Sequence, residues 1–455
     1  MTDGALRELS AGQLGVWNAQ QLAPASPAYN VNAYQEIRGP LDVDLMVEAL
    51  RRAVGETDAY RLRFRLLDGM PRQYVEAPDA YGIQVVDVGG EPDPRAAAER
   101  VMRQDENRAV DLLREPVSVQ ILFLLGPRLV FWYQRVHHIA ADGYSLALFA
   151  VLVARHYNAL RDGGTGESPA PELSPLSELW DAEARYRSSE TFARDREFWL
   201  DRLSNLPEDP RRGRHRPRWS PDSLERHTRT AGPGQAASVR AAAERLRVSV
   251  PELAAAAAGL LQFRLTGSRD VVIAVPCSGR IGADEFNTIG MTSNMMPLRL
   301  TVDPLASVAE FVRHAVATVR TALRHQRFRY EDIVRELKFA DGVPLFGLKI
   351  NAMRLRNIRL GDCVGILRPA SLGRVEELAV NIYDRVDDGD IQIDVGVSRD
   401  LPDEPAAARV GDWYVRALEG LSGPPDVRVH EVDLLSSGDR ELLGGWAGVV
   451  GPVGV

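Results

Sequence analysis

The residues of this sequence best suited to chemistry form the run HHIAADG, which extends from His137 to Gly143. A neutral imidazole can accept a proton from an attacking amine or hydroxyl near neutral pH, or orient that group by a hydrogen bond. Successive side chains of a strand point to opposite faces, so His137 and His138 cannot both enter one cavity. One of the two histidines is therefore expected to serve structure.

The other polar positions of the run suit a turn that starts a helix. Asp142 can cap the following helix through its side-chain oxygen, or bond an arginine and so fix the turn. Gly143 lets the backbone approach closely, and its N–H can point toward a developing oxyanion. The same residues would also be found if the two histidines were only packed in the fold and Asp-Gly formed an ordinary turn. These residues alone leave both interpretations open.

Apolar patterns on both sides of the run predict the elements that hold it. Two strands are expected at 117–125 and 128–136, joined by a turn at Gly126 and Pro127. The stretch 144–160 is apolar and has the length of a helix. The histidines therefore lie in a strand-to-helix connection.

The rest of the chain alternates between helical and strand patterns, which predicts an α/β (α+β) fold. Helices are expected at 41–54, 94–107, 176–203, 235–246, 251–265, 308–326 and 330–337, and strands at 59–67, 82–88, 271–275, 348–353, 378–383 and 391–397. A stretch rich in glycine, proline and serine ends at Pro175. We expect it to separate an N-terminal lobe, residues 1–175 with the histidine run, from a C-terminal lobe, residues 176–455.

The composition narrows the possible partners. A net charge of −8 weighs against nucleic acid, and the one basic run, Arg211 to Trp219, is interpreted as a solvated loop. No apolar run is long enough to cross a bilayer and the start lacks a secretory signal, so we expect a cytoplasmic protein without a membrane partner. Cys277 and Cys363 are too few for a disulfide framework, and the histidines lack metal-ligand spacing, so no metal is expected.

The run HHIAADGYS resembles the HHxxxDG signature of the superfamily that contains nonribosomal peptide synthetase condensation domains and chloramphenicol acetyltransferase. The four fixed positions are matched by His137, His138, Asp142 and Gly143. Five further stretches resemble the other motifs of condensation domains, in the same order: LSAGQLGVWNAQQL, ETDAYRLRF, IGMTSNMMPLR, RHQRFRYEDIV and VPLFGLKINAM. The resemblance covers nearly the whole chain and leans toward the enterobactin-synthetase type.

Two of these stretches depart from the family pattern. The usual Arg-His-Glu opening of the second motif is absent before Arg61. In IGMTSNMMPLR, where the family has Phe-Val-Asn-Thr, Asn294 fits but Thr292, Ser293 and Met295 do not. These three residues motivate the hypothesis of an unusual acceptor substrate.

The resemblance implies a fold of two chloramphenicol-acetyltransferase-like lobes that form a V-shaped pseudodimer with a central tunnel. It implies that His138 faces the tunnel as the catalytic histidine, that Gly143 can assist it, and that His137 and Asp142 support the turn. In the family the aspartate pairs with an arginine, for which Arg280 is the first candidate and Arg61 the second. The resemblance also suggests candidates for the tunnel lining, which are Ser145, Asn294 and Met296.

The function implied by the resemblance is that of a condensation enzyme. It would transfer an acyl or aminoacyl thioester from a peptidyl carrier protein to an amine or hydroxyl, held by a second carrier or free as a small molecule. The carrier supplies the phosphopantetheine arm, so no bound cofactor is expected. An epimerisation domain and a non-catalytic partner-docking domain are the alternatives. Because no adenylation or carrier domain accompanies it, we expect a free-standing enzyme.

Overall fold

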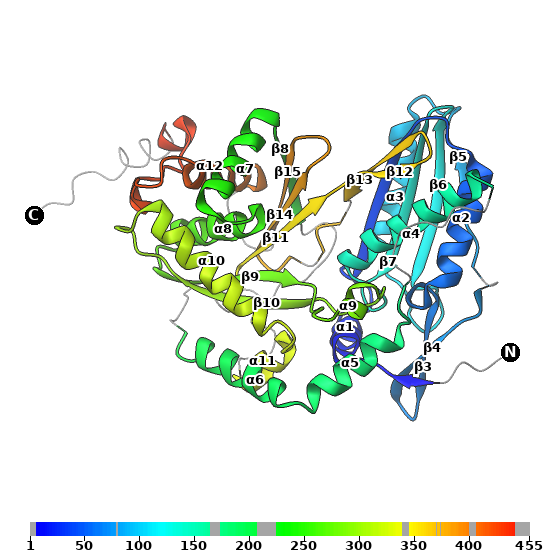
Figure 1. The fold of residues 1–455 in the computed structure, drawn as a ribbon, viewed down its shortest axis with the longest axis horizontal. Helices are drawn as coiled ribbons and strands as arrows, with labels where there is room; N and C mark the ends of the chain where they lie inside the picture. Colours follow the sequence, from blue (N-terminus) through cyan, green and yellow to red (C-terminus); the bar gives the residue numbers. More distant parts are fainter. Residues whose placement is uncertain are drawn as a thin grey trace, which may run out of the picture.

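The computed structural model describes residues 6–78, 81–163, 173–206, 224–338, 345–369, 371–373, 375–399 and 406–441. The basic run 211–219 and Pro344 lie outside these ranges. Two six-stranded sheets, each with parallel and antiparallel pairs, lie side by side with helices packed on them (Figure 1). The expected mixed α/β class is thereby confirmed.

The first sheet holds the histidine run at the end of a central strand. Its order is β12-β13-β2-β7-β6-β5. Helices α2 and α4 pack on one face and α3 on the other. The bounds are β2 Asn30–Arg38, β5 Gln84–Asp87, β6 Ser118–Gly126, β7 Leu129–His137, β12 Ile358–Leu360, β13 Cys363–Pro369, α2 Val43–Glu56, α3 Pro94–Glu106 and α4 Gly143–Arg161.

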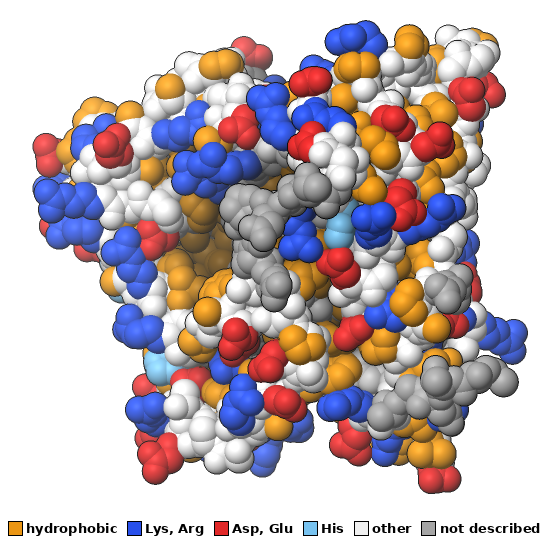
Figure 2. Space-filling view, turned by 45° about the vertical axis from the view of Figure 1, so that its right-hand side comes forward, with side chains coloured by type: hydrophobic (Ala, Val, Ile, Leu, Met, Phe, Trp, Pro, Cys, Tyr) orange, Lys and Arg blue, Asp and Glu red, His pale blue; other side chains and the backbone are white. Residues whose placement is uncertain are grey.

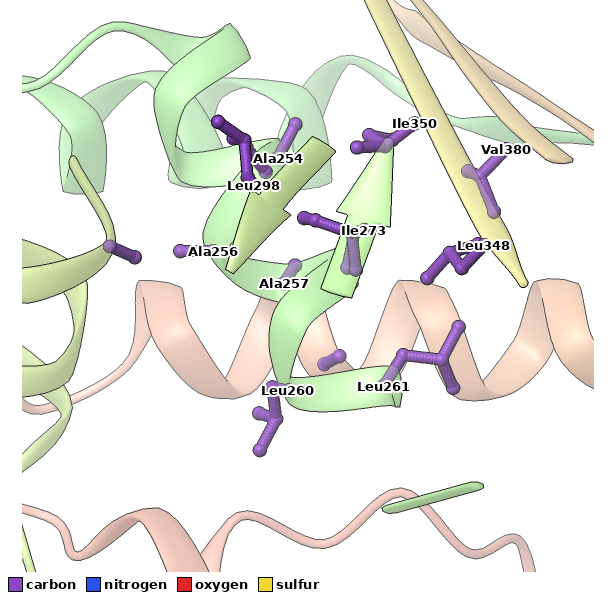
Figure 3. Packing of buried hydrophobic residues seen from close by; sticks show 14 of the residues in the cluster. Ala254, Ala256, Ala257, Leu260, Leu261, Ile273, Leu298, Leu348, Ile350 and Val380 are labelled. Atoms are coloured by element: carbon purple, nitrogen blue, oxygen red, sulfur yellow. The ribbon is translucent and has the colours of Figure 1, made fainter. Parts of the chain in front are cut away.

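The second sheet has the order β10-β9-β11-β14-β15-β8, and its core lies against helices α7, α8, α10 and α12. Small side chains let α8 approach the sheet closely, and Figure 3 shows its alanines beside Ile273, Leu298 and Ile350. The bounds are β8 Leu224–Ala231, β9 Asp270–Cys277, β10 Asn294–Thr301, β11 Leu348–Leu355, β14 Leu378–Arg385, β15 Ile391–Ser398, α7 Pro233–Leu246, α8 Val250–Thr266, α10 Val308–Arg324 and α12 Ala407–Ser422.

Smaller elements lie below and between the sheets in Figure 1. A three-stranded sheet has the order β1-β4-β3. Helix α1 begins with a capping box in which Ser10 and Gln13 bond each other's backbone N–H groups. The bounds are β1 Arg7–Glu8, β3 Leu62–Leu67, β4 Met70–Val75, α1 Ala11–Leu22, α5 Ser177–Arg187, α6 Glu190–Leu203, α9 Ala283–Phe286 and α11 Tyr330–Glu336, with 3-10 turns at Asp58–Arg61 and Val429–Glu431.

The predicted division after residue 175 does not separate the strands completely. Strand β13 comes from the second half of the chain but pairs with β2 along its length, from Val364 opposite Arg38 to Pro369 opposite Ala33. Figure 1 shows β12 and β13 at the edge of the first sheet. An exposed strand edge readily pairs with other chains, so β13 covers the side of β2 that would otherwise be open.

The helix expected at 176–203 is two helices, because Ser189 interrupts it. Ser189 has an extended backbone, and its hydroxyl accepts a hydrogen bond from the Phe192 N–H at 3.3 Å, which starts α6 anew. The hairpin of β6 and β7 and the helix α4 after the histidine run are confirmed. Strands β1, β2, β4, β8, β10, β12 and β13 and helices α1, α9 and α12 were not predicted.

Candidate active site

His137 is a structural residue of the loop between β7 and α4. Its ring is buried, and its Nδ1 atom accepts a hydrogen bond from the Ile139 N–H at 3.3 Å. Burial, with His138 and Arg135 nearby, lowers the pKa of His137 to about 3. The ring is therefore neutral at physiological pH and is held by its own loop.

His138 differs from its neighbour in that its ring is not engaged. Its backbone N–H donates to the Tyr29 carbonyl at 2.7 Å, and the residue as a whole is half-buried. In the described part of the chain, no residue forms a hydrogen bond with the ring, and Nδ1 is buried without a partner. Burial lowers the pKa of His138, Asp142 opposes this effect, and Lys349 and Arg329 add to it. A neutral, uncommitted imidazole results.

Asp142 is the centre of a buried hydrogen-bond network. One carboxylate oxygen accepts from the N–H of Ser145 at 3.0 Å and from its hydroxyl at 2.9 Å. The other accepts from the N–H groups of Thr292 and Ser293, both at 3.1 Å, and from Arg280. Burial alone would raise the pKa of Asp142, but Arg280 and these donors hold it below its ordinary value. The side chain is ionised and fully used.

Arg280 is the arginine that pairs with Asp142, as the resemblance implied. Its side chain is 0% exposed, and Nη1 lies 2.7 Å from the carboxylate. Nη2 donates to the Ser145 hydroxyl and to the Gly290 carbonyl, each at 3.0 Å. Arg61 lies elsewhere, since its Nη2 donates to Asp58 at 2.8 Å. Only the first of the two proposed arginines is part of the network.

Ser145 lies inside the network rather than on the wall of a cavity. Its side chain is fully buried, and its oxygen receives the Gly290 N–H at 3.0 Å and lies 2.8 Å from the Gly290 carbonyl. Because Ser145 lies in the first turn of α4 and Gly290 precedes β10, this hydroxyl joins the two halves of the chain. Its position corrects the expectation that it lines a tunnel.

The other two candidates for the tunnel lining are also structural. The amide of Asn294 donates to the carbonyls of Gln326 and Phe328, both at 2.8 Å, and accepts from the Tyr330 N–H at 3.0 Å. Met296 is 1% exposed and belongs to the core of the second sheet. Asn294 uses its polar atoms to anchor the segment before α11, and neither side chain is available to a substrate.

Thr292 and Ser293, which depart from the family pattern, each donate a backbone N–H to the Asp142 carboxylate. Any residue would supply these N–H groups to Asp142, but the Thr292 hydroxyl also lies 3.2 Å from the same carboxylate oxygen. The Thr292 hydroxyl lies 2.7 Å from the Ser278 carbonyl and thus ties the loop to its neighbour. Gly279, with φ of 69°, is required because a Cβ would come 2.3 Å from the Thr292 carbonyl oxygen.

Gly143 is the first residue of α4 and is exposed. A Cβ at this position would meet no atom within 4 Å. The glycine thus leaves open space at the helix N-terminus, where backbone N–H groups favour negative charge. This placement is compatible with the oxyanion role expected from the sequence.

Two cations near the histidine were not identified from the sequence. Lys349, on β11, is 9% exposed, and its ammonium donates to the Leu372 carbonyl at 3.0 Å. Arg329 donates to the carbonyls of Thr292 and Ser293. The only signal for Lys349 was its rarity, because Lys338 is the one other lysine.

The described residues offer little to a metal or a thiol mechanism. Burial raises the pKa of Cys277 to about 12, so its thiol stays protonated. Among the described residues there is no group of three or more histidine, cysteine, aspartate or glutamate side chains that could hold a metal ion. None of the described helices is both long and apolar enough to cross a membrane.

The surface is hollowed on the face drawn in Figure 2, with hydrophobic side chains inside the hollow and basic ones on its upper rim. A separate pocket touches Gln13, Gly279, Thr292 and Arg329, and His138 is not among its lining residues.

The two-sheet fold and the buried Asp142–Arg280 pair agree with the resemblance to condensation domains that the sequence motifs indicated. The sequence matches the Condensation domain family over residues 6–443, and the chain belongs to that family. It is therefore an acyltransferase of the nonribosomal peptide synthetase class, which serves natural-product biosynthesis. Condensation domains act on substrates bound to carrier proteins.

Several known proteins are similar over almost the entire chain. The dimodular nonribosomal peptide synthase of Bacillus subtilis is 35% identical over 438 residues, which are 96% of this chain and 18% of that protein. The isonitrile lipopeptide synthase of Streptomyces coeruleorubidus is 34% identical over 436 residues, which are 95% of this chain and 29% of that protein. The chain thus spans less than a third of the length of these relatives.

Solved structures show the same fold. The starter condensation domain of rhizomide synthetase, in complex with C8-CoA and Leu-SNAC, superposes with a TM-score of 0.85 at 29% identity, covering 95% of this chain and 98% of that one. The first condensation domain of the calcium-dependent antibiotic synthetase, in complex with a substrate analogue, gives 0.83 at 33% identity, covering 95% and 100%.

Proposed function

We propose that this chain transfers an acyl or aminoacyl group from the thioester of a peptidyl carrier protein to an amine or a hydroxyl. The observation that carries the proposal is the contrast within one loop. Asp142 is fixed by Arg280, Ser145 and two N–H groups, while the adjacent His138 ring is neutral and unengaged. A rigid loop thus presents one free imidazole.

In the proposed reaction, the acceptor nitrogen or oxygen attacks the thioester carbonyl. A C–N or C–O bond forms, the C–S bond breaks, and the thiol of the carrier arm leaves with a proton. His138 takes the proton from the nucleophile or orients it, an effect of about 10² to 10⁴-fold in rate. The open N-terminus of α4 at Gly143 would stabilise the negative charge on the carbonyl oxygen.

Most of the rate enhancement in this proposal comes from positioning. Two substrates held in one tunnel replace a bimolecular encounter, which lowers a barrier by roughly 7 to 11 kcal/mol. We propose that the tunnel runs between two lobes in a V, and that the hollow in Figure 2 belongs to it. The donor carrier and a second carrier or a soluble acceptor would approach its mouths, and the carrier brings the phosphopantetheine arm, so the chain needs no cofactor of its own.

The decisive test is turnover of His138→Ala with a loaded carrier and a panel of soluble and carrier-bound amines and alcohols, followed by mass spectrometry. We expect a loss of at least about 10²-fold with an unchanged melting temperature, because the ring has no hydrogen bond to lose. Cys277→Ala is the matched control, since its buried thiol is protonated. Wild-type turnover by the His138 variant would reject the catalytic assignment.

The same assay separates the alternatives. Exchange of the α-hydrogen of a loaded aminoacyl carrier with deuterated solvent, without product, would indicate an epimerisation domain. Binding of carriers with neither exchange nor product would indicate a docking domain. An amide or an ester product identifies the acceptor class.

A further inference from the structure

Gly12 and Gly15 of helix α1 leave room for the side chains of an ion pair, Arg329 and Glu331. A Cβ at Gly12 would come 3.0 Å from the Arg329 guanidinium, and one at Gly15 would come 3.0 Å from the Glu331 carboxylate. The Arg329 Nε atom lies 3.4 Å from the Glu331 Oε2 atom. Larger residues at positions 12 and 15 would therefore displace this pair from α1.

From this position beside α1, Arg329 contacts the segment before β10 whose N–H groups bind Asp142. Its Nη1 atom donates to the Thr292 carbonyl at 3.2 Å and to the Ser293 carbonyl at 2.9 Å. In the peptide unit between Thr292 and Ser293, the Thr292 carbonyl accepts from Arg329 and the Ser293 N–H donates to Asp142 at 3.1 Å. Cation, peptide dipole and carboxylate are aligned, and hydrogen bonds in such a chain strengthen one another.

A second contact from α1 reaches the histidine run directly. The Gln13 amide donates to the Ile139 carbonyl at 3.1 Å and pairs with the Gln73 amide at 2.8 Å. Gln13 and Arg329 both line one pocket, together with Thr292. Helix α1 thus contacts the connection between β7 and α4 directly, through Gln13 and Ile139. It reaches Asp142 indirectly, through Arg329 and the Thr292–Ser293 segment.

We propose that Arg329 is a positioning residue for the reaction: through the Thr292–Ser293 peptide it fixes Asp142 and thereby the β7–α4 connection that presents the His138 ring. The inference rests on the proposed function and deepens it. Arg329 does not touch the reacting atoms. It aligns with Asp142 through one peptide, whereas an arginine that only closes a surface ion pair with Glu331 would have no effect on His138.

The role has an electrostatic consequence that a purely structural residue lacks. The charged groups that act on His138 are Asp142 on the α4 cap, Lys349 on β11 and Arg329 before α11, and His137 is the neighbouring titratable ring. The Arg329 charge disfavours protonation of His138. Its removal should raise the pKa of His138 and move the acidic limb of the pH–rate profile to higher pH.

The test compares Arg329→Gln and Arg329→Lys in the full chain, measuring kcat, KM and the pH dependence of kcat/KM with a loaded carrier. We expect Arg329→Gln to lower kcat about tenfold or more, as for the loss of a charge-assisted hydrogen bond, with the acidic limb shifted upward. Arg329→Lys should restore the limb, because the charge returns. Its kcat should stay several-fold low, because an ammonium does not reproduce the guanidinium geometry.

Arg335→Gln is the matched control, since this arginine lies on α11 and its side chain is 71% exposed. Wild-type kcat in both Arg329 variants would overturn the inference and leave the proposed function intact. A wild-type chain that forms no product would count against the proposed function. The inference would then be decided by NMR titration of His138, assigned with His138→Gln. An unchanged His138 pKa in Arg329→Gln would overturn it, and a raised one would support it.

If Arg329→Gln fails to fold, the Lys variant decides, because it keeps the charge and the ion pair with Glu331. A several-fold loss of kcat at an unchanged KM and melting temperature supports the positioning role. Wild-type kcat in this variant overturns it.

Discussion

The two ends of the loop between β7 and α4 use their polar side chains in opposite ways. At one end the Asp142 carboxylate is buried and accepts from Arg280, Ser145, Thr292 and Ser293. At the other end the His138 ring has no hydrogen bond to a described residue. The difference shows that the motif divides into a scaffold and a reactive group. Substitutions at the two ends should therefore have separable effects on stability and on rate.

The largest effect on stability is expected from Asp142→Ala. The Arg280 guanidinium would remain buried without its counter-ion, and breaking a buried pair in this way costs about 3 to 5 kcal/mol. Urea unfolding should show this loss, whereas His138→Ala should unfold as the wild type does. Equal stability of the two variants would remove the distinction between the ends of the loop.

Ser145→Ala should have the next largest effect. It leaves the Arg280 Nη2 donor and the Gly290 N–H without their common acceptor inside the protein. An unsatisfied buried group costs about 1 to 3 kcal/mol. Thermal unfolding at pH 7 is the measurement, with Ser188→Ala on the exposed turn after α5 as the control. A melting temperature within a degree of wild type would show that water replaces the hydroxyl at little cost.

The histidine pair should make stability depend on pH. The folded pKa of His137 is about 3, while a histidine in the unfolded chain titrates near 6.5. Below about 6.5 the unfolded chain binds a proton that the native state does not, so stability is full above that pH and falls toward pH 3. We expect a loss of about 1 to 2 kcal/mol between pH 7 and pH 5.

His137→Asn is the informative comparison for this pH dependence, because its side-chain oxygen can accept from Ile139 in place of Nδ1. Denaturant unfolding at pH 7 and pH 5 should show a smaller loss in this variant than in the wild type. The same loss in both would assign the pH dependence to another histidine such as His138, whose lowered pKa acts in the same direction and the same pH range.

Thr292→Val should have the smallest effect. It removes the hydroxyl that bonds the Ser278 carbonyl and lies 3.2 Å from Asp142, but keeps the N–H that bonds Asp142. A loss of about 1 kcal/mol with wild-type turnover is expected, since backbone contacts are preserved. A change of acceptor preference in product analysis by mass spectrometry would instead support the hypothesis that this position selects the acceptor.

The features that could be predicted from the sequence are those formed by residues close together in the chain. The hairpin, the helix and the loop between them arise from local patterns, and all three are confirmed around His138. The Arg280 pairing spans the two halves and was accessible only through the resemblance. Ser145 was misplaced for the same reason, because its partner Gly290 lies in the other half and no local pattern reveals it.

The strands that were missed have physical causes of their own. Strand β8 is an edge strand with several exposed polar residues, so its sequence lacks an apolar period. Strand β13 belongs to a sheet whose other members precede it in the chain, and its order there is not encoded locally. Asn294 and Met296 were assigned to a tunnel because their neighbours match a motif, although the packing of β10 buries both.

The pairing of β13 with β2 also orders events during synthesis. Domains fold as units from the N-terminus while the ribosome is still extending the chain. One edge of β2 has no partner until Pro369 has been made, by which time most of the second half has emerged. The strands of the first sheet that come early in the chain thus wait, with an exposed strand edge, for a segment translated much later, and the sheet is complete only once β12 and β13 have been made.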